Sequence, residues 1–495
     1  MSIYISTRNK NSRFESHAAV IQGLAPDGGL FVPETIKPFL NLCRLQNLSY
    51  EETAFEILSA FMDDYSSENL KACIHSAYKD SFDTDKIAPT VSFGSNALLE
   101  LWHGPTCAFK DIALTLLPHL MRTACSMDYI DDTIAILTAT SGDTGKAAIS
   151  GFSNVPNTSI TVFYPEDGVS DIQKRQMQTS VGNNVNVVSV QGNFDDCQRM
   201  VKEACSSHEV LESLDHVRIS SANSINTGRL LPQIVYYVTS YMDMVRMKKI
   251  SIGDPVNFSV PTGNFGDILA GYIAKLIGLP IKRLICASNS NHVLTDFINT
   301  GIYSIDRQFL STMSPSMDIL ISSNLERLLF LMSGRNESLV QKCMQSLHDK
   351  GSYAVPDHLK QTIQCLFSGY WANEEQCAQE IRSTYENDHI LIDPHTAVGA
   401  YAMHAYQDET SDHTPCIVLS TASPYKFAKD VYRSLSGIEI SDSFEAIEQL
   451  HAHTGIAIPK PISSIQNMPI RFNESIAVND GIPYLCKYLK EVRHD

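Results

Sequence analysis

Short β-rich runs alternate with longer helical runs along most of this chain, from about residue 95 to residue 430. The first clear pair is Thr133–Ala139 followed by Lys146–Phe152. Later strand candidates are Ser159–Phe163, Asn186–Val190, Val217–Ser220, Val256–Val260, Arg283–Ala287 and Cys416–Leu419. One helix candidate between them begins near Ser170. The other helix candidates are Phe194–Ala204, Arg229–Met244, Ile268–Ile277 and Tyr425–Leu435. This alternation predicts an α/β fold, a mostly parallel sheet covered by helices on both faces.

The composition excludes several classes of protein. The chain has 495 residues and a formal net charge of −17. An acidic chain is a poor candidate for a nucleic-acid binder, which needs a basic surface. No apolar run approaches the ~20 residues of a membrane helix, and Met1–Arg13 lacks the apolar segment of a signal peptide. The 12 cysteines are scattered, with no Cys-x-x-Cys pair, which predicts reduced thiols, no metal site and a cytoplasmic protein.

The first motif is Gly104–Asp111, which places Lys110 among apolar neighbours. A lysine amine in an apolar pocket has a lowered pKa and becomes a nucleophile that forms Schiff bases with carbonyl compounds, including pyridoxal phosphate. The alternative is a surface lysine at the start of a helix, with Asp111 as an ordinary acid of the first turn.

Two loops resemble anion cradles, because each joins a strand to a helix through small residues. They are Ala139–Gly145 and Pro261–Asp267. Glycines allow close backbone approach, and amides at a helix N-terminus attract carboxylates and phosphates. Gly142–Lys146 does not fit a P-loop, because only two residues separate its glycines and Ala147 follows the lysine. An ordinary tight turn remains the alternative for each loop.

Two further loops add polar groups. Asn223–Arg229 carries an arginine, whose forked guanidinium is well suited to a dianionic phosphate. Its alternative is structural, with Asn226 or Thr227 capping the next helix. Leu419–Pro424 follows the last strand and offers Thr421 to a cleft, although Thr421 and Ser423 are equally suitable as helix caps.

Taken together, these motifs resemble those of threonine synthase, in its bacterial and fungal branch. The family consists of pyridoxal-phosphate enzymes of fold type II. Further matching segments are Ser6–Arg8, Gly23–Glu34, Leu101–Thr106 and Ser314–Asp318. The resemblance implies two parallel-sheet αβα subdomains with the cofactor between them. It divides the chain into a mainly helical N-terminal region (1–95), a catalytic core (96–430, smaller subdomain roughly 130–220) and a C-terminal extension packed on the core (431–495).

The resemblance also implies residue roles. Lys110 is the catalytic residue and holds the cofactor covalently. The expected cofactor-binding residues are Lys110, Gly263, Asn264, Phe265, Gly266, Asp267, Thr421 and Asp143. The expected substrate-binding residues are Thr140, Ser141, Thr144, Asn223, Ser224 and Arg229.

The implied reaction converts O-phospho-L-homoserine and water to L-threonine and phosphate, the last step of threonine biosynthesis. The implied partner is this small molecule, with neither nucleic acid nor membrane, and the chain is a monomer or homodimer. The alternatives are another fold-type II enzyme, such as a serine/threonine dehydratase or a β-replacement synthase, and a homologue that binds ligand without chemistry.

Two positions depart from the patterns of relatives. Ser423 stands where many relatives have histidine, and Asp143 stands where related fold-type II enzymes carry asparagine. An aspartate there requires a protonated partner or a rotated side chain.

Overall fold

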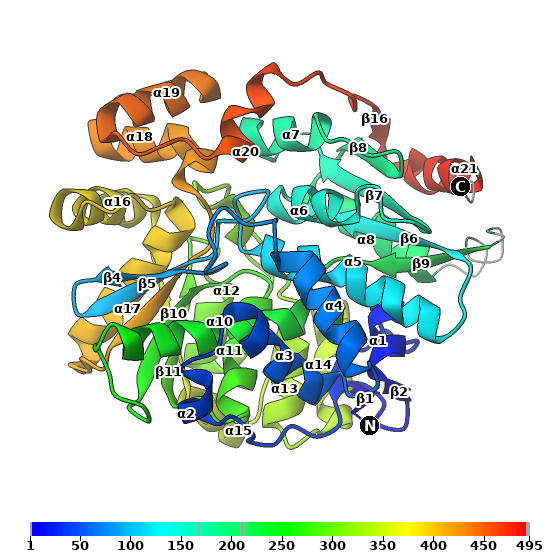
Figure 1. Cartoon of the computed structure of the whole chain (residues 1–495), viewed down its shortest axis with the longest axis horizontal. Coiled ribbons are helices and arrows are strands. Elements are labelled where there is room, and N and C mark those ends of the chain that lie inside the picture. The colour runs from blue at the N-terminus through cyan, green and yellow to red at the C-terminus, as the bar shows by residue number, and fades with distance from the viewer. Residues whose placement is uncertain (1, 167, 207–209, 211–213, 215, 492–495) are drawn as a thin grey trace.

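The computed structural model describes residues 2–166, 168–206, 210, 214 and 216–491. Among the helices of these residues, none combines the length and the apolar character needed to cross a membrane. Two parallel sheets dominate the fold, one in the upper and one in the lower part of Figure 1.

The larger sheet has six strands in the order β14-β11-β10-β15-β5-β4. All neighbours are parallel except β4, which pairs antiparallel with β5. Its strands are β4 (Thr90–Phe93), β5 (Asn96–Glu100), β10 (Val256–Pro261), β11 (Ile281–Ser288), β14 (Phe367–Trp371) and β15 (Cys416–Ser420). Since β4 belongs to this sheet, the core's first strand begins before residue 96.

The smaller sheet is parallel throughout, in the order β16-β8-β7-β6-β9. Its strands are β6 (Thr133–Ala139), β7 (Thr158–Pro165), β8 (Val185–Gln191), β9 (Val217–Ser221) and β16 (Ser475–Ala477). The helices of this part are α6 (Asp143–Phe152), α7 (Asp171–Gln178) and α8 (Phe194–Ser206). Strands buried along their whole length, such as β6 and β7, require cover on both faces of the sheet.

The central part of the chain also forms α5 (Lys110–Met127), α10 (Thr227–Arg246), α11 (Gly266–Leu276), α12 (Val293–Thr300), α13 (Leu325–Met332), α14 (Glu337–Lys350), α15 (Asp357–Gln364), α16 (Glu374–Asp388) and α17 (Pro394–Thr410). Among them, α11, α12 and α17 pack directly on the strands of the larger sheet. A short hairpin, β12 (Ile302–Ser304) with β13 (Ser352–Ala354), and a 3-10 turn at Pro315–Met317 complete this part. The helices α5, α10 and α11 begin where strand-to-helix loops end, so their N-termini meet between the sheets.

The N-terminal region contains a small antiparallel sheet that the sequence analysis did not anticipate. Its order is β2-β1-β3, from β1 (Ile3–Ser6), β2 (Arg13–Glu15) and β3 (Phe31–Pro33). The helices are α1 (Ser16–Gln22), α2 (Leu42–Leu45), α3 (Tyr50–Phe61) and α4 (Ser67–Tyr78). Helix α4 packs on α5, and α3 packs on α10. The region therefore supports the two helices that begin at Lys110 and next to Arg229.

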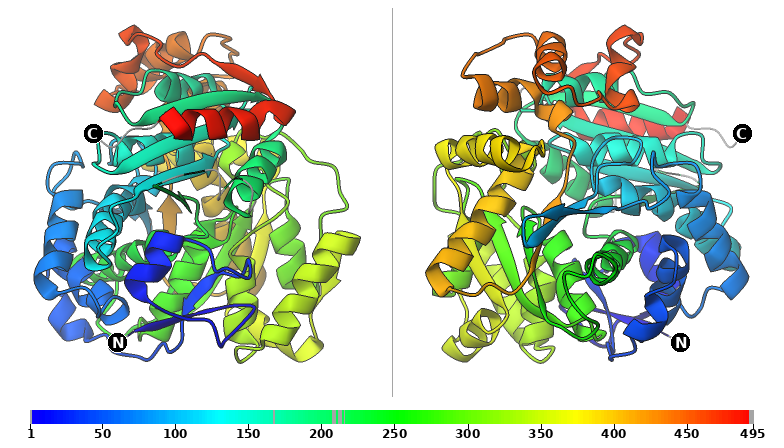
Figure 2. Two further views of the ribbon diagram at one scale, coloured as in Figure 1. Left: turned by 90° about the vertical axis from the view of Figure 1, so that its right-hand side faces the viewer. Right: turned by 60° about the vertical axis from the view of Figure 1, so that its left-hand side comes forward.

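The C-terminal extension runs from the larger sheet to the smaller one (Figure 2). It contains α18 (Ala428–Ser436), α19 (Ser443–Thr454), α20 (Lys460–Ser463), two 3-10 turns (Ile465–Asn467 and Val478–Asp480), β16 and α21 (Gly481–Glu491). Ile476, Leu485 and Leu489 are buried in a cluster with residues of β6 and β8. The extension therefore adds both a strand and apolar cover to the smaller sheet.

Candidate active site

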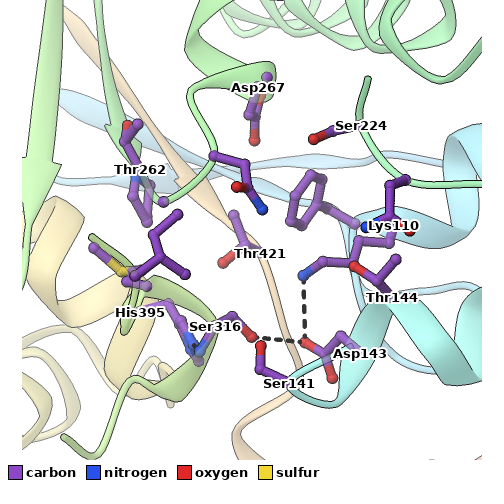
Figure 3. A pocket seen from close by; sticks show the side chains of 18 of the residues that line it. Lys110, Ser141, Asp143, Thr144, Ser224, Thr262, Asp267, Ser316, His395 and Thr421 are labelled. Carbon is purple, nitrogen blue, oxygen red and sulfur yellow. Dashed lines mark hydrogen bonds and ion pairs between the residues drawn. The ribbon is translucent and has the colours of Figure 1, made fainter. Parts of the chain in front are cut away.

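A pocket lies at the carboxyl ends of strands from both sheets (Figure 3). Every site residue expected from the sequence lines it: Lys110, Thr140, Ser141, Asp143, Thr144, Asn223, Ser224, Arg229, Gly263, Asn264, Phe265, Gly266, Asp267 and Thr421. Five loops far apart in the chain thus converge at the place where open α/β sheets bind ligands. Ser423 is buried and outside this lining, so the histidine-to-serine departure lies behind the pocket wall.

The loop before Lys110 is fixed by the carboxyl group of Asp111. That group accepts hydrogen bonds from the backbone N–H of Thr106 at 2.8 Å and from the Thr106 hydroxyl at 2.5 Å. A side chain on Gly104 would approach Asp111 to 2.5 Å, so the loop requires glycine there. Burial raises the pKa of Asp111 to about 6. Asp111 is therefore an organising residue of the loop and more than an ordinary first-turn acid.

The Lys110 loop is tied directly to the Thr421 loop. The N–H of Phe109 donates to the carbonyl of Thr421 at 2.9 Å, and the N–H of Ser423 donates to the carbonyl of Cys107 at 3.1 Å. Lys110 is the first residue of α5 and Thr421 directly follows β15. These two backbone bonds set the spacing between the amine and the Thr421 hydroxyl.

The amine of Lys110 lies in a low-dielectric site. Burial lowers the pKa of this amine from 10.5 to about 8, with Arg229 and Lys426 acting in the same direction and Asp143 opposing them. The Nζ atom lies 3.7 Å from Oδ2 of Asp143. A lysine with this pKa is available as a neutral nucleophile near neutral pH far more often than an exposed one.

Asp143 has a second cationic neighbour that the sequence analysis missed. Lys426 is fully buried, and its Nζ binds Oδ1 of Asp143 and the carbonyl of Thr106, the latter at 3.0 Å. Gln173 donates to the same carboxylate at 2.8 Å, and Ser316 donates to Oδ2 at 3.3 Å. Burial alone would raise the pKa of Asp143, but Lys426 and Lys110 hold it below the usual range. Lys426 therefore gives Asp143 a basic partner inside the pocket wall.

Lys426 was overlooked because the expected helix Tyr425–Leu435 was wrong at its start. The chain forms a 3-10 turn at Pro424–Phe427, and α18 begins only at Ala428. This turn directs the lysine back toward the sheet. A lysine within an otherwise apolar run, directly after the last strand, was the available signal.

The loop Pro261–Asp267 has the geometry of a phosphate cradle. Phe265, the residue before α11, adopts a left-handed conformation with φ of 61°. A Cβ atom on Gly263 would lie 2.9 Å from the carbonyl oxygen of Ser316, so a larger residue would close the loop. The hydroxyl of Ser322 holds the carbonyl of Gly263 at 2.6 Å. The amides at the start of α11 then face the pocket as anion donors.

Asp267, in the first turn of α11, is held by two tyrosines. The hydroxyl of Tyr236 donates to its carboxylate at 2.6 Å and that of Tyr237 at 3.0 Å. Burial raises the pKa of Asp267 to about 6, although both hydrogen bonds oppose this shift. The side chain therefore anchors the start of α11 to α10.

In the loop Ala139–Gly145, the Thr140 hydroxyl accepts hydrogen bonds within the loop, whereas Ser141 and Thr144 line the pocket. The oxygen of Thr140 accepts from the N–H groups of Gly142 and Gly145, both at 2.9 Å. Gly142 has a φ of 136°, and a side chain there would collide with Gln173. Ser141 and Thr144 lie close to Lys110 and Asp143 in Figure 3.

Arg229 is a buried cation with unused donors. It is 3% exposed, and its Nη1 donates to the carbonyl of Ala222 at 3.0 Å. Within the described part of the chain, its Nε has no hydrogen-bond partner, nor does Oδ1 of Asn223. Burial lowers the pKa of Arg229 to about 10, so the group remains charged. Asn226 caps α10 by accepting a hydrogen bond from the N–H of Gly228 at 2.8 Å, which is the structural role that the sequence analysis gave as the alternative for this loop.

His395 also lines the pocket, although no motif of the sequence analysis includes it. Its Nε2 accepts from the N–H of Ser316 at 3.2 Å, which leaves Nδ1 to donate to Asp393 at 2.7 Å. Both ring nitrogens are therefore committed, and the ring positions the loop that carries Ser316.

Three family models match the chain. They are described as Threonine synthase N terminus (residues 3–78), Pyridoxal-phosphate dependent enzyme (97–421) and Threonine synthase, C-terminal (396–468). The last two together cover the loops that form most of the pocket.

Curated relatives and solved structures agree with these models. The chain is 40% identical to human Threonine synthase-like 1 over 88% of its own length, and it spans 61% of the length of that relative. It is 37% identical to threonine synthase of Pseudomonas aeruginosa, covering 94% of this chain and 97% of that protein. A pyridoxal-phosphate-bound threonine synthase structure from Brucella melitensis superposes with a TM-score of 0.87 at 35% identity, with 99% of each chain covered. The protein belongs to the threonine synthase family of pyridoxal-phosphate dependent enzymes.

Proposed function

We propose that this protein uses pyridoxal phosphate to convert O-phospho-L-homoserine and water into L-threonine and phosphate. The observation that supports this most is Arg229, a buried cation with unused donors in a pocket that already contains a glycine cradle. One cradle serves the phosphate of the cofactor. A second anion site beside it is suited to a substrate that carries its own phosphate.

The pocket residues fit the cofactor. The backbone of Gly263–Gly266 would hold its phosphate, the Thr421 hydroxyl would hydrogen-bond its ring nitrogen, and Lys110 would bind its aldehyde. Asp143 stays ionised beside Lys110 because the ion pair with Lys426 stabilises its carboxylate. Bound pyridoxal phosphate supplies a conjugated ring that accepts electron density from the α-carbon of the substrate.

The remaining roles belong to side chains of this protein. The amine of Lys110 would take the proton from Cα of the substrate, and its lowered pKa suits it to both accept and return protons near neutral pH. Ser141 and Thr144, in the loop shaped by Thr140, donate to the substrate carboxylate. Asn223, Ser224 and Arg229 bind the substrate phosphate and stabilise the charge that grows as it leaves.

The proposal is tested with purified holoprotein and O-phospho-L-homoserine, with phosphate and threonine measured together. We expect equal amounts of both products and no ammonia. Faster ammonia release from threonine or serine would identify a dehydratase instead. Binding of the cofactor without turnover of any of these substrates would identify a ligand-binding homologue without chemistry.

We further propose that the protein acts in the cytoplasm as a monomer or homodimer. The eleven cysteines whose side chains are described are all free thiols, which suits a reducing compartment. Light scattering of the purified protein tests the oligomeric state, and fluorescence imaging of the tagged full chain tests the compartment.

A further inference from the structure

Arg327, on α13 behind the pocket wall, is fully buried and hydrogen-bonded almost entirely to backbone carbonyls. Its Nε donates to Phe31 at 2.9 Å, and its Nη1 donates to Ser224 at 3.1 Å. Its Nη2 donates to Ile225, and Nη1 also binds Oδ1 of Asn324. The neighbouring acid, Glu326, is engaged by Arg8 instead, at 2.8 Å. A buried guanidinium with this set of acceptors fixes the loop that begins at Asn223.

Asn324 has only one possible orientation as a result. A guanidinium donates and never accepts, so the atom of Asn324 that faces Arg327 is the carbonyl oxygen Oδ1. The amide nitrogen Nδ2 must then point to the other side. There it donates to the hydroxyl oxygen of Ser224 at 3.0 Å and to the carbonyl of Asn264 at 3.1 Å. One buried amide thus joins the substrate loop to the phosphate cradle.

The hydroxyl of Ser224 consequently has a defined direction. Its oxygen accepts from Asn324, and its proton has no acceptor among the described residues. Ser224 lines the pocket in the same loop as Arg229, and its hydroxyl is directed into the cavity in Figure 3. A hydroxyl that accepts one hydrogen bond is also a stronger donor through the next one.

We propose that Arg327 and Asn324 are positioning residues that hold the Ser224 hydroxyl as a hydrogen-bond donor to the phosphate group of the substrate. This inference rests on the proposed function, because it assigns Ser224 to a phosphorylated substrate. It also gives the N-terminal region a part in the site, because the carbonyl of Phe31 in β3 is one of the acceptors that fix Arg327. Neither Arg327 nor Asn324 lines the pocket, so both act through Ser224.

The decisive variant is Asn324→Asp, which is almost isosteric. A carboxylate keeps the bond from Arg327 but gives up the bond to the carbonyl of Asn264. It also presents an acceptor to Ser224 and draws the hydroxyl proton away from the pocket. With cofactor bound, we expect the affinity for inorganic phosphate to fall at least tenfold and the KM for O-phospho-L-homoserine to rise by a similar factor. The absorbance spectrum of the bound cofactor stays unchanged. Asn336→Asp, at an exposed helix cap, adds the same charge and is the matched control, with no change expected.

A double-mutant cycle separates positioning from general disruption. Asn324→Ala and Ser224→Ala are each expected to weaken phosphate binding about tenfold, and the double variant is expected to equal Ser224→Ala alone. Losses that multiply would overturn the proposal, because they would show that Asn324 does not act through Ser224. Failure of the wild type to bind phosphate would overturn it as well. If the wild type binds phosphate but does not turn over the substrate, the proposed function fails while the cycle still decides the role of Asn324.

Discussion

Two of the loops that we propose to bind anions differ in the groups that they present to the pocket. The cradle at Pro261–Asp267 presents backbone amides, and its critical residues are glycines and the left-handed Phe265. The loop at Asn223–Arg229 presents side chains, which depend on Asn324 and Arg327 from another helix. A backbone site is determined by local sequence, whereas a side-chain site is determined by what packs behind it. We therefore expect a substitution within one of these loops to affect that loop more than the other, whereas a change at Asn324, which contacts both, should affect both.

Lys110, which lies between the two loops, should show the largest effect. Lys110→Ala removes the group that we propose to bind the cofactor aldehyde and to move the Cα proton, so turnover should fall at least a thousandfold. Steady-state phosphate release measures this, and circular dichroism checks the fold. Threonine formation at more than a few per cent of the wild-type rate would show that another group carries the chemistry.

Arg229→Met should damage only the side-chain site. Loss of a buried cation that binds a dianion should raise the KM for O-phospho-L-homoserine about a hundredfold. The affinity for the cofactor, measured by absorbance titration, should change less than threefold. Arg199→Met removes an exposed arginine and serves as the control. Equal losses for substrate and cofactor would mean that the two loops are not separate sites.

Gly263→Ala should damage only the backbone site. Its Cβ would lie 2.9 Å from the carbonyl of Ser316, so the cradle must shift. We expect the affinity for pyridoxal phosphate to fall about tenfold, while the cofactor-saturated enzyme keeps its KM within about threefold. Gly437→Ala, where a Cβ atom would meet nothing within 4 Å but φ is 74°, controls for the backbone strain of replacing a glycine away from the pocket. A raised KM with unchanged cofactor affinity would assign this loop to the substrate.

Lys426→Met tests the charge beside Lys110, because Lys426 contacts Asp143 and Thr106 and belongs to neither of the two loops. Removing this cation ends its repulsion of Lys110 and leaves Asp143 to pair with Lys110 alone, so the pKa of Lys110 should rise from about 8 by roughly one unit. Covalent attachment of the cofactor, trapped by reduction across a pH series, should then require higher pH. Lys429→Met, at a partly exposed lysine, is the control. An unchanged pH profile would remove Lys426 from the site electrostatics.

A substitution of His17 should lower the stability of the fold and leave ligand binding by both loops unchanged. Its Nδ1 lies 2.7 Å from Asp64 and its Nε2 lies 2.9 Å from Asp128, which joins α1 to the end of α5. Burial alone would lower the pKa of His17, but the two carboxylates raise it above the ordinary value. The stabilisation is therefore complete below about pH 6.5 and lost as pH rises through the folded pKa. His17→Ala should lower the free energy of unfolding at pH 6 by about 2 kcal/mol and less at pH 9. A loss independent of pH would show that the imidazole contributes only packing.

The sequence predicted the fold and the pocket loops well because both follow from local patterns. Buried strands such as Thr133–Ala139 are built around an apolar run, here Ile134–Leu137, and the glycine loop that follows marks the end of the strand. The missed elements have no such pattern. The sheet β2-β1-β3 is formed by strands of three or four residues, which are too short to show alternation. The 3-10 turn at Pro424–Phe427 differs from an α-helix by a single hydrogen-bonding step, which periodicity does not resolve.

The sequence by itself determined which residue types meet in the pocket: a lysine, two small-residue loops, an arginine loop and a threonine. It could do so because strand ends converge in any parallel sheet. Only the tertiary structure decided which of these side chains are free to act. Lys426 neutralises Asp143 from 283 residues away, and Asn324 orients Ser224 from 100 residues away. Hydrogen-bond direction and charge pairing depend on distances in space, and no local pattern in the sequence contains them.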